Sequence, residues 1–221
     1  MRMSCYLWSI AIFSSREDSA TLLECLSAVF RFARSAQPVA VDLIVNGNQA
    51  LGTRMAADAR ALECAPNIDF RIWFIPLGDK AQAINEYFHR IRPDSDIGFF
   101  IDGYIRLRAD SISALARTLE DSPAAFGASG VPTVGRSAGA LRQEMMRNGG
   151  IHGNLFALNS QAFAKIIESG FKIPLGLYRT DSLIRAAACF DFDPPNATWN
   201  SDRIAVCADA SWDLINPPVH G

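Results

Sequence analysis

Two aspartates and a lysine stand where an α/β fold places reactive side chains. Asp102 directly follows the apolar run Asp96–Ile101, Lys80 lies between an expected strand and an expected helix, and Asp181 precedes a short apolar helical pattern. A carboxylate at the end of a buried strand can hold a metal ion or a ribose hydroxyl. A lysine beside helix N–H groups can bind phosphate, and an aspartate on a loop can act as a general base.

Each of these residues also has a purely structural interpretation. Asp102 precedes a glycine, a pairing that turns favour, and the local sequence leaves the two interpretations even. Lys80 alone reads more readily as an exposed, solvated lysine that follows a helix-capping Asp79. Asp181, or Thr180 before it, fits the N-cap of a helix.

Other polar residues carry less weight. His152 lies in the Gly-rich stretch 148–154 and is expected to be a surface residue of a flexible loop. His89 and Asn85 are expected on the surface of a helix, and His220 is the penultimate residue. The sequence shows no serine-hydrolase elbow, H-E-x-x-H helix or Walker A loop, so those reaction classes are not expected.

Four short apolar runs predict the strands that position these residues. They are Cys5–Phe13, Val39–Val45, Ile68–Ile75 and Asp96–Ile101. Helices are expected at Leu22–Ala33, Leu51–Leu62, Ala81–Ile91 and from the N-cap Asp110 to Leu119. Strands about 30 residues apart match a βαβ unit, and mostly apolar strands are typical of a sheet covered on both faces. We therefore predict an α/β fold with a mostly parallel central sheet and helices on both faces.

The chain beyond Glu120 has a different pattern. Gly, Pro and Ser cluster in residues 122–139, which predicts loops around one short strand. A further strand is expected at Leu155–Leu158, a helix from Ser160 that stops at Gly170, and a short helix from Thr180. Without internal repeats or a long linker, residues 1–221 are predicted to form a single domain.

Ligands of parallel α/β sheets bind beyond the carboxyl ends of the strands. The segments expected there are Ser14–Asp18, Asn46–Gln49, Pro76–Lys80 and Asp102–Arg108. One polar segment of this kind would mean little, but four at matching positions predict a shared site.

Composition narrows the range of functions. The chain of 221 residues has a formal net charge of −2, without the basic footprint of a nucleic-acid-binding protein, so no nucleic-acid partner is expected. Five cysteines with no C-x-x-C pair argue against a disulfide framework or a zinc ribbon. The apolar run Cys5–Phe13 is shorter than the ~20 residues of a transmembrane helix and lacks a cleavage signal. A cytoplasmic protein without a transmembrane segment is therefore expected.

The order of these segments resembles glycosyltransferase family 2, whose fold is GT-A. The family's opening strand and polar loop match Ile10–Glu17, and its second strand matches Leu43–Asn48. Its G-x-K-A-x-A-x-N element, the most specific match, is Gly78–Asn85. Its D-x-D strand and the following helix start match Phe99–Asp110, and its acidic motif matches Thr180–Leu183. The resemblance covers roughly residues 4–188, most of the chain.

The resemblance implies an inverting, hexosyltransferase-like enzyme. Such an enzyme moves a sugar from a nucleoside-diphosphate sugar to a hydroxyl of an acceptor that the sequence does not identify. Residues 1–120 would form the nucleotide-binding half, and residues 121–221 would form the acceptor-side half. Asp181 would be the catalytic base, and a divalent cation, Mn²⁺ or Mg²⁺, would bind at Asp102. The nucleotide-binding residues would be Ser14, Arg16, Glu17, Asn46, Lys80 and Asp102.

The sequence departs from the family pattern in three places. Tyr104 replaces the second acid of D-x-D, and Thr180 replaces the glutamate of the family's Glu-Asp pair. A single carboxylate holds a divalent cation poorly, which predicts weaker metal dependence than is usual for the family. The carboxylate that usually contacts the base after the second strand is Asn46 or Asn48 here, which bears on nucleotide preference.

Two alternative functions stay open on the sequence. A nucleotidyltransferase on a similar sheet would use a sugar phosphate and a nucleoside triphosphate. It would carry a Gly-rich loop after the first strand, which Ser14–Glu17 lacks. A catalytically inactive relative that only binds a nucleotide or a partner protein is the other alternative, and Tyr104 is the feature that favours it.

Overall fold

A seven-stranded sheet forms the centre of the protein in the computed structural model, which describes residues 6–33 and 38–215. The strand order is β3-β2-β1-β4-β7-β6-β8. The bounds are β1 (Tyr6–Ser14), β2 (Val39–Asn46), β3 (Ile68–Ile75), β4 (Ser95–Asp102), β6 (Gly127–Ser129), β7 (Leu155–Asn159) and β8 (Ile204–Val206). Of these strands only β7 runs antiparallel to its neighbours, so all the others point the same way. The predicted mostly parallel sheet is confirmed, and Cys5, its predicted first residue, lies outside the described residues.

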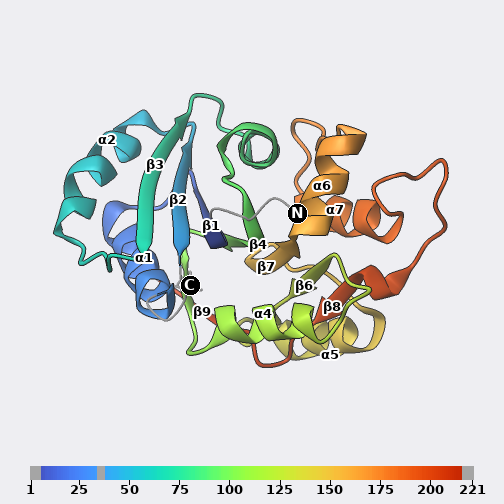
Figure 1. Cartoon of the computed structure of the whole chain (residues 1–221). Coiled ribbons are helices and arrows are strands. Elements are labelled where there is room, and N and C mark those ends of the chain that lie inside the picture. The colour runs from blue at the N-terminus through green and yellow to red at the C-terminus, as the bar shows by residue number, and fades with distance from the viewer. Residues whose placement is uncertain (1–5, 34–37, 216–221) are drawn as a thin grey trace.

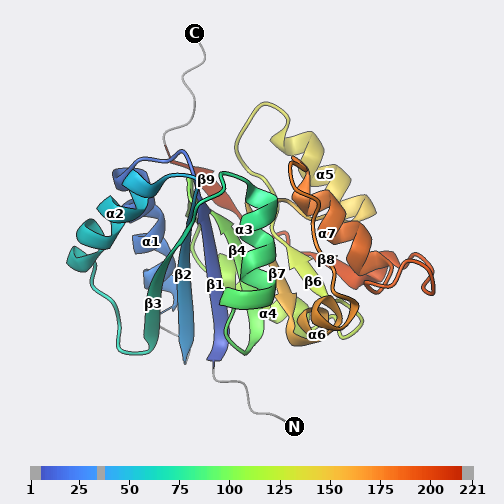
Figure 2. The same ribbon diagram turned by 90° about the horizontal axis from the view of Figure 1, so that it is seen from above.

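Helices cover both faces of this sheet (Figures 1 and 2). On one face pack α1 (Ser19–Ala33), α2 (Gln49–Asp58) and α4 (Ser111–Glu120). On the other pack α3 (Lys80–Glu86), the π-helical turn η2 (Tyr87–Ile91), α6 (Ser160–Ser169) and α7 (Thr180–Cys189). Successive strand residues point to opposite faces, so Ile10 and Ile12 join the first core while Ala11 and Phe13 join the second. Burial on both faces explains why the strands read as continuous apolar runs.

Several elements differ from the sequence prediction. Helix α5 (Ala138–Asn148) was not predicted, because it buries only two side chains, Ala138 and Met145, and so lacks a clear apolar face. The short elements η3 (Ser201–Arg203) and β8 were also missed. Helix α2 ends at Asp58 and continues as the 3₁₀ turn η1 (Ala59–Ala61), slightly before the predicted end.

The predicted helix boundaries are mostly confirmed. Gly170 ends α6 in the left-handed conformation, with φ of 64°. Asp110 does lie at the N-cap of α4, but its φ is 62° and its side chain makes no capping hydrogen bond. The predicted N-cap position of Asp110 is therefore confirmed, but the predicted capping hydrogen bond from its side chain is not formed.

A second sheet, of two strands, lies next to the carboxyl end of β4. Strand β5 (Ile105–Leu107) pairs antiparallel with β9 (Trp212–Leu214), and Ile215 N donates to Tyr104 O at 2.9 Å. This pairing brings the C-terminal part of the described chain next to Asp102 and Tyr104. The sequence did not predict it, because the contact joins residues more than 100 positions apart.

Two glycines bring the strand-end loops together. Gly47 follows β2 with φ of 71°, and a Cβ at this position would lie 2.4 Å from the Cα of Gly78. No other residue type permits both this left-handed backbone and such a close approach. The loop after β2 thus packs directly against the segment that begins α3.

Within the described part of the chain, none of the helices combines the length and the apolar character that a membrane crossing requires.

Candidate active site

The segments predicted to form a site meet in one cleft at the carboxyl ends of the strands. The cleft has a volume of about 940 Å³, within the range typical of ligand sites. Its lining includes every predicted site residue: Ser14, Arg16, Glu17, Asn46, Lys80, Asp102 and Asp181. Across the cleft lie α5, residues 148–154 and the start of α7. The expected position of Asp102, at a strand end in a cleft, is confirmed.

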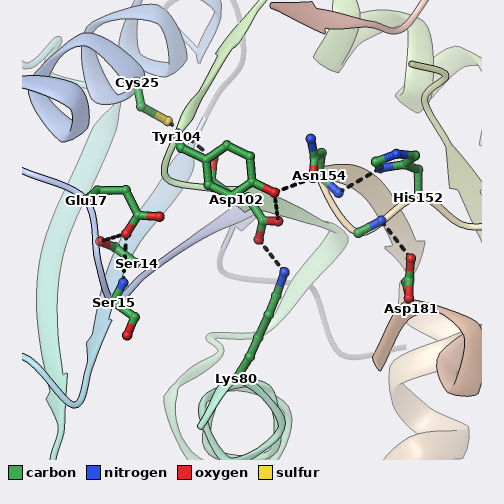
Figure 3. A network of polar contacts seen from close by, with 11 residues as sticks. Ser14, Ser15, Glu17, Cys25, Lys80, Asp102, Tyr104, His152, Asn154 and Asp181 are labelled. Carbon is green, nitrogen blue, oxygen red and sulfur yellow. Dashed lines mark hydrogen bonds and ion pairs between the residues drawn. The ribbon is translucent and has the colours of Figure 1, made fainter. Parts of the chain in front are cut away.

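Asp102 is the centre of a polar network (Figure 3). The carboxylate is 9% exposed and pairs through Oδ1 with the Lys80 ammonium. Its Oδ2 accepts from the Tyr104 hydroxyl at 3.1 Å and from Asn154 Nδ2 at 3.2 Å. The same Asn154 amide donates to the Tyr104 oxygen at 2.8 Å, and its Oδ1 accepts from Trp212 Nε1 at 3.0 Å. Every polar group of the network is thus paired, as burial requires.

Burial sets the protonation of this network. It raises the pKa of Asp102, while the Lys80 ammonium and the Tyr104 hydroxyl oppose that shift by stabilising the carboxylate. Burial and the neighbouring Asp102 raise the pKa of Tyr104 far above its usual value. Tyr104 therefore stays a phenol near neutral pH and acts as a donor to Asp102.

Lys80 is not the solvated lysine that the local sequence favours. It is the first residue of α3, and its ammonium points toward Asp102 (Figure 3). Asp79 is the N-cap, as predicted: it accepts from Gln82 N at 2.9 Å and also from Gly176 N at 2.6 Å. Asp79 therefore fixes the start of α3 and ties it to the loop before α7.

Asn85, expected on the surface, is buried instead. Its Nδ2 donates to Ile173 O at 2.8 Å, and its Oδ1 accepts from Ile173 N at 2.9 Å. The surface expectation for Asn85 is wrong, because this side chain completes the backbone hydrogen bonds of the loop at Ile173. The loop between α6 and α7 is therefore held against α3 at two points, by Asn85 at Ile173 and by Asp79 at Gly176.

Glu17 shapes the loop that follows β1. Its Oε2 accepts from Ser14 Oγ at 2.7 Å, from Ser15 N at 2.8 Å and from Arg16 N at 3.0 Å. Glu17 therefore fixes the loop from within, and the Arg16 side chain is left exposed at the lining of the cleft.

Asn46 and Asn48 connect the same loop to its neighbours. Asn46 Nδ2 donates to Ser14 O at 2.9 Å, and its Oδ1 accepts from Asp79 N at 3.3 Å. Asn48 donates to Ser15 O at 3.1 Å and caps α2 by accepting from Leu51 N at 3.0 Å. Both asparagines therefore hold the loops after β1 and β2 and the start of α3 in fixed positions relative to one another.

Asp181 links α7 to the Gly-rich turn instead of capping the helix. The N-cap of α7 is Arg179, and Asp181 lies one residue inside the helix after Thr180. Its Oδ2 accepts from Gly153 N at 3.1 Å and its Oδ1 from Ser182 N at 2.9 Å. The carboxylate is partly exposed and faces the same cleft as Lys80 and Asp102.

His152 is part of the site, which corrects the expectation of a flexible surface residue. Its ring packs on Trp212 with centroids 4.8 Å apart, and its Nδ1 accepts from Asn154 N at 3.2 Å. Burial lowers the pKa of His152, although Asp181 and Asp102 oppose the shift. The imidazole is therefore neutral near pH 7 and carries its proton on Nε2.

This lowered pKa predicts a pH-dependent stability. The unfolded chain takes up a proton near pH 6.5, the usual value for histidine, before the folded protein does. Lowering the pH from 7.5 to 5.5 should therefore reduce the free energy of unfolding, because protonation of the His152 side chain in the unfolded chain favours the unfolded state. Urea titrations at both pH values measure this loss, and His152→Gln should show a smaller one. An equal loss in both proteins would contradict it.

The residues around Asp102 do not fit a divalent cation. Its partners Lys80, Tyr104 and Asn154 are hydrogen-bond donors, and a hard cation requires several oxygen ligands. Across residues 6–33 and 38–215, no three His, Cys, Asp or Glu side chains converge as a metal site would need.

Comparison with known proteins identifies the fold. No family model and no curated protein matches the sequence. Among solved structures, mannosyltransferase PcManGT from Pyrobaculum calidifontis, in complex with GDP-Man and Mn²⁺, aligns with a TM-score of 0.70 at 15% identity. The alignment covers 97% of this chain and 58% of that one. TarS 1-349 of S. aureus, in complex with UDP-GlcNAc, has a TM-score of 0.66 at 11% identity over 97% of this chain and 59% of its own.

A third neighbour matches over more of its own length. Glucosyl-3-phosphoglycerate synthase from Mycobacterium tuberculosis, in complex with Mn²⁺, UDP-Glc and phosphoglyceric acid, has a TM-score of 0.63 at 14% identity. The alignment covers 97% of this chain and 74% of that chain. At such identities the similarity establishes the fold, which is GT-A as the sequence predicted. Two of these complexes contain Mn²⁺. This chain spans under two thirds of PcManGT and of TarS 1-349.

Proposed function

We propose that this chain is a glycosyltransferase that moves a sugar from a nucleoside-diphosphate sugar to an acceptor hydroxyl with inversion at the anomeric carbon. The observation that carries the proposal is the placement of Lys80, Asp102 and Asp181 around one cleft of a GT-A fold. Solved neighbours of this fold contain GDP-Man, UDP-GlcNAc or UDP-Glc, which supports a nucleotide-sugar ligand.

The nucleotide occupies the side of the cleft formed by residues 1–120 in this proposal. Ser14 and Asn46 are the last residues of β1 and β2, and Arg16 and Glu17 belong to the loop after β1. Lys80 is the first residue of α3. The loops after β1 and β2 are held by internal hydrogen bonds, so their shape is set before a ligand binds. Preorganised loops of this kind reduce the entropy cost of binding.

The reaction that fits this arrangement is a single displacement. Asp181 takes the proton of the acceptor hydroxyl, whose oxygen forms a bond to the anomeric carbon. The bond from that carbon to the diphosphate oxygen breaks on the opposite face, and the electron pair leaves with the nucleoside diphosphate. Lys80 offsets the negative charge that develops on the leaving group.

The acceptor lies on the side formed by residues 121–221 in this proposal. Tyr178, 96% exposed, and Trp199, 48% exposed, line the cleft there together with Arg185. Arg185 lies over the Trp199 ring at 5.6 Å and donates to Asn148 O at 2.8 Å, so the tryptophan and the Gly-rich turn are linked. Exposed amphipathic aromatic rings provide a contact surface for an acceptor.

Thermal unfolding with a panel of nucleoside diphosphates tests the proposal. A ligand at about 100 times its Kd adds ~2.7 kcal/mol, which should raise Tm by roughly 5–10 °C for a chain of this size. Release of nucleoside diphosphate from the matching sugar donor should follow, and transfer should rise with an added acceptor. Stabilisation without donor turnover would indicate an inactive nucleotide-binding relative. Turnover of a nucleoside triphosphate with a sugar phosphate would indicate a nucleotidyltransferase.

A further inference from the structure

Protein donors already occupy three of the roughly four acceptor positions of the Asp102 carboxylate. Lys80 pairs with Oδ1, while Tyr104 at 3.1 Å and Asn154 at 3.2 Å donate to Oδ2. A cation that approached this carboxylate would find at most one free acceptor position unless it displaced one of these donors. The Lys80 ammonium, at the contact it makes with Oδ1, would also repel it.

The network is built into the fold and is not a loose arrangement of surface side chains. Trp212 is 1% exposed, belongs to β9, and fixes the Asn154 amide through its Nε1 at 3.0 Å. Asp102 N donates to Asn154 O at 3.2 Å, so the backbone also holds the two residues together. A carboxylate held this way keeps the ammonium of Lys80 directed into the cleft.

Tyr104 is the residue that most clearly changes the chemistry. It stands where the family pattern has a second carboxylate, and its neutral phenol donates a hydrogen bond to Asp102 where an acid would offer an oxygen ligand. The change from acid to tyrosine thus removes a metal ligand and adds a hydrogen-bond donor.

We propose that the Lys80 ammonium takes the place of the divalent cation, so that the site binds the diphosphate of its donor without a metal. An ammonium has three N–H donors. One is used by Asp102, and the other two are available for phosphate oxygens. Asp102 then acts as a positioning residue that orients Lys80, and Tyr104 and Asn154 orient Asp102. This inference rests on the proposed nucleotide-sugar function.

Calorimetry of nucleoside diphosphate binding tests the inference without reliance on turnover. UDP and GDP are titrated into the full chain in EDTA and, separately, in Mn²⁺. The Kd of the nucleotide that binds should differ by less than about threefold between the two conditions. Mn²⁺ alone, followed by electron paramagnetic resonance, should show no bound ion at stoichiometric protein.

Variants at position 104 sharpen the test. Tyr104→Asp places a second carboxylate in the network and should make Mn²⁺ tighten nucleotide binding by about tenfold or more, with bound Mn²⁺ visible in the resonance spectrum. Tyr104→Phe, the matched control, removes the hydroxyl without adding an oxygen ligand. Its affinity for the nucleotide should respond to Mn²⁺ as little as that of the unaltered chain.

The outcomes separate this inference from the proposed function. Nucleotide binding to the unaltered chain that requires Mn²⁺ would overturn the inference and leave the proposed function standing. Failure of every nucleoside diphosphate to bind, with and without Mn²⁺, would remove the proposed function and this inference with it. A Tyr104→Asp variant that stays indifferent to Mn²⁺ would overturn the part assigned to Tyr104.

Discussion

Replacing Lys80 with alanine should weaken binding of a nucleoside diphosphate on the order of 10²-fold, while binding of the parent nucleoside changes by less than about threefold. A hydrogen bond to a charged group contributes ~1.5–3 kcal/mol, and Lys80 is placed to donate two to the phosphates. Loss of Lys80 also leaves the Asp102 carboxylate facing the diphosphate, which adds repulsion. Calorimetry of the nucleotide and the nucleoside side by side measures both affinities.

The stability of this variant provides its control. Asp102 loses its counterion, which should cost ~1–3 kcal/mol, less than for a fully buried pair because 37% of the Lys80 side chain is exposed. The remaining burial raises the pKa of Asp102, and a raised carboxyl pKa destabilises the folded state increasingly as the pH rises through it. The deficit relative to the unaltered chain should therefore be larger at pH 7.5 than at pH 4.5.

A double variant separates affinity from stability. Lys80→Ala/Asp102→Asn removes the uncompensated charge and should recover most of the lost free energy of unfolding. It should recover only the part of the nucleotide affinity that repulsion by Asp102 removed, and not the part contributed by the Lys80 hydrogen bonds. Equal losses of affinity for the nucleoside and the nucleoside diphosphate in Lys80→Ala would contradict the phosphate-binding role. Full recovery of affinity in the double variant would contradict it as well.

The first half of the fold was predictable because its signals are local. Strands β1, β2 and β4 are largely buried on both faces, so each appears in the sequence as an apolar run of the right length. The edge strand β3 is mostly exposed or half-buried, but its apolar and aromatic residues still form a recognisable run. Helix α6 was equally easy to predict, because its periodic apolar residues and the glycine that ends it, Gly170, lie within one short segment of the sequence. Helix α5 was not, because only two of its side chains, Ala138 and Met145, are buried, which leaves no clear apolar face.

The site was predictable where one short segment carries the signal. Gly78–Asn85 and the strand that ends at Asp102 placed Lys80 and Asp102 in the cleft from the sequence alone. The partners of Asp102 were not predictable. Asn154 reaches Asp102 through pairing of β4 with β7, and Trp212, which donates to Asn154, is brought there by pairing of β5 with β9. Both contacts depend on the completed fold. Polar residues at 152 and 154 within a Gly-rich stretch were the one available hint.

The distant pairing also explains the error at His152. A histidine among glycines has the composition of an exposed loop, and nothing nearby in the sequence indicates burial. The ring is partly buried because Trp212, 60 residues away, packs on it. Local composition predicts backbone flexibility, but tertiary contacts decide whether such a turn is held in place.

Asp181→Asn should reduce turnover by ~10²-fold or more while nucleotide affinity stays unchanged, because an amide cannot take the proton of the acceptor hydroxyl. The structural cost should be small. An asparagine retains one oxygen to accept from Gly153 N or Ser182 N and loses the other bond, worth ~1 kcal/mol. Steady-state transfer rates, urea unfolding and calorimetry on the same preparation measure all three quantities.

Asp79→Asn is the matched control for this variant. Asp79 also lines the cleft and also accepts from two backbone N–H groups, those of Gln82 and Gly176, so it should lose similar stability. Its turnover should stay within a few-fold of normal, because capping α3 and holding a loop require no proton transfer.

In a second test, added formate should restore part of the turnover of Asp181→Ala by supplying a small carboxylate in the vacated space. Equal losses of turnover in Asp181→Asn and Asp79→Asn would instead make Asp181 a structural link between α7 and the Gly-rich turn. Full transfer by a well-folded Asp181→Asn would exclude it as the base.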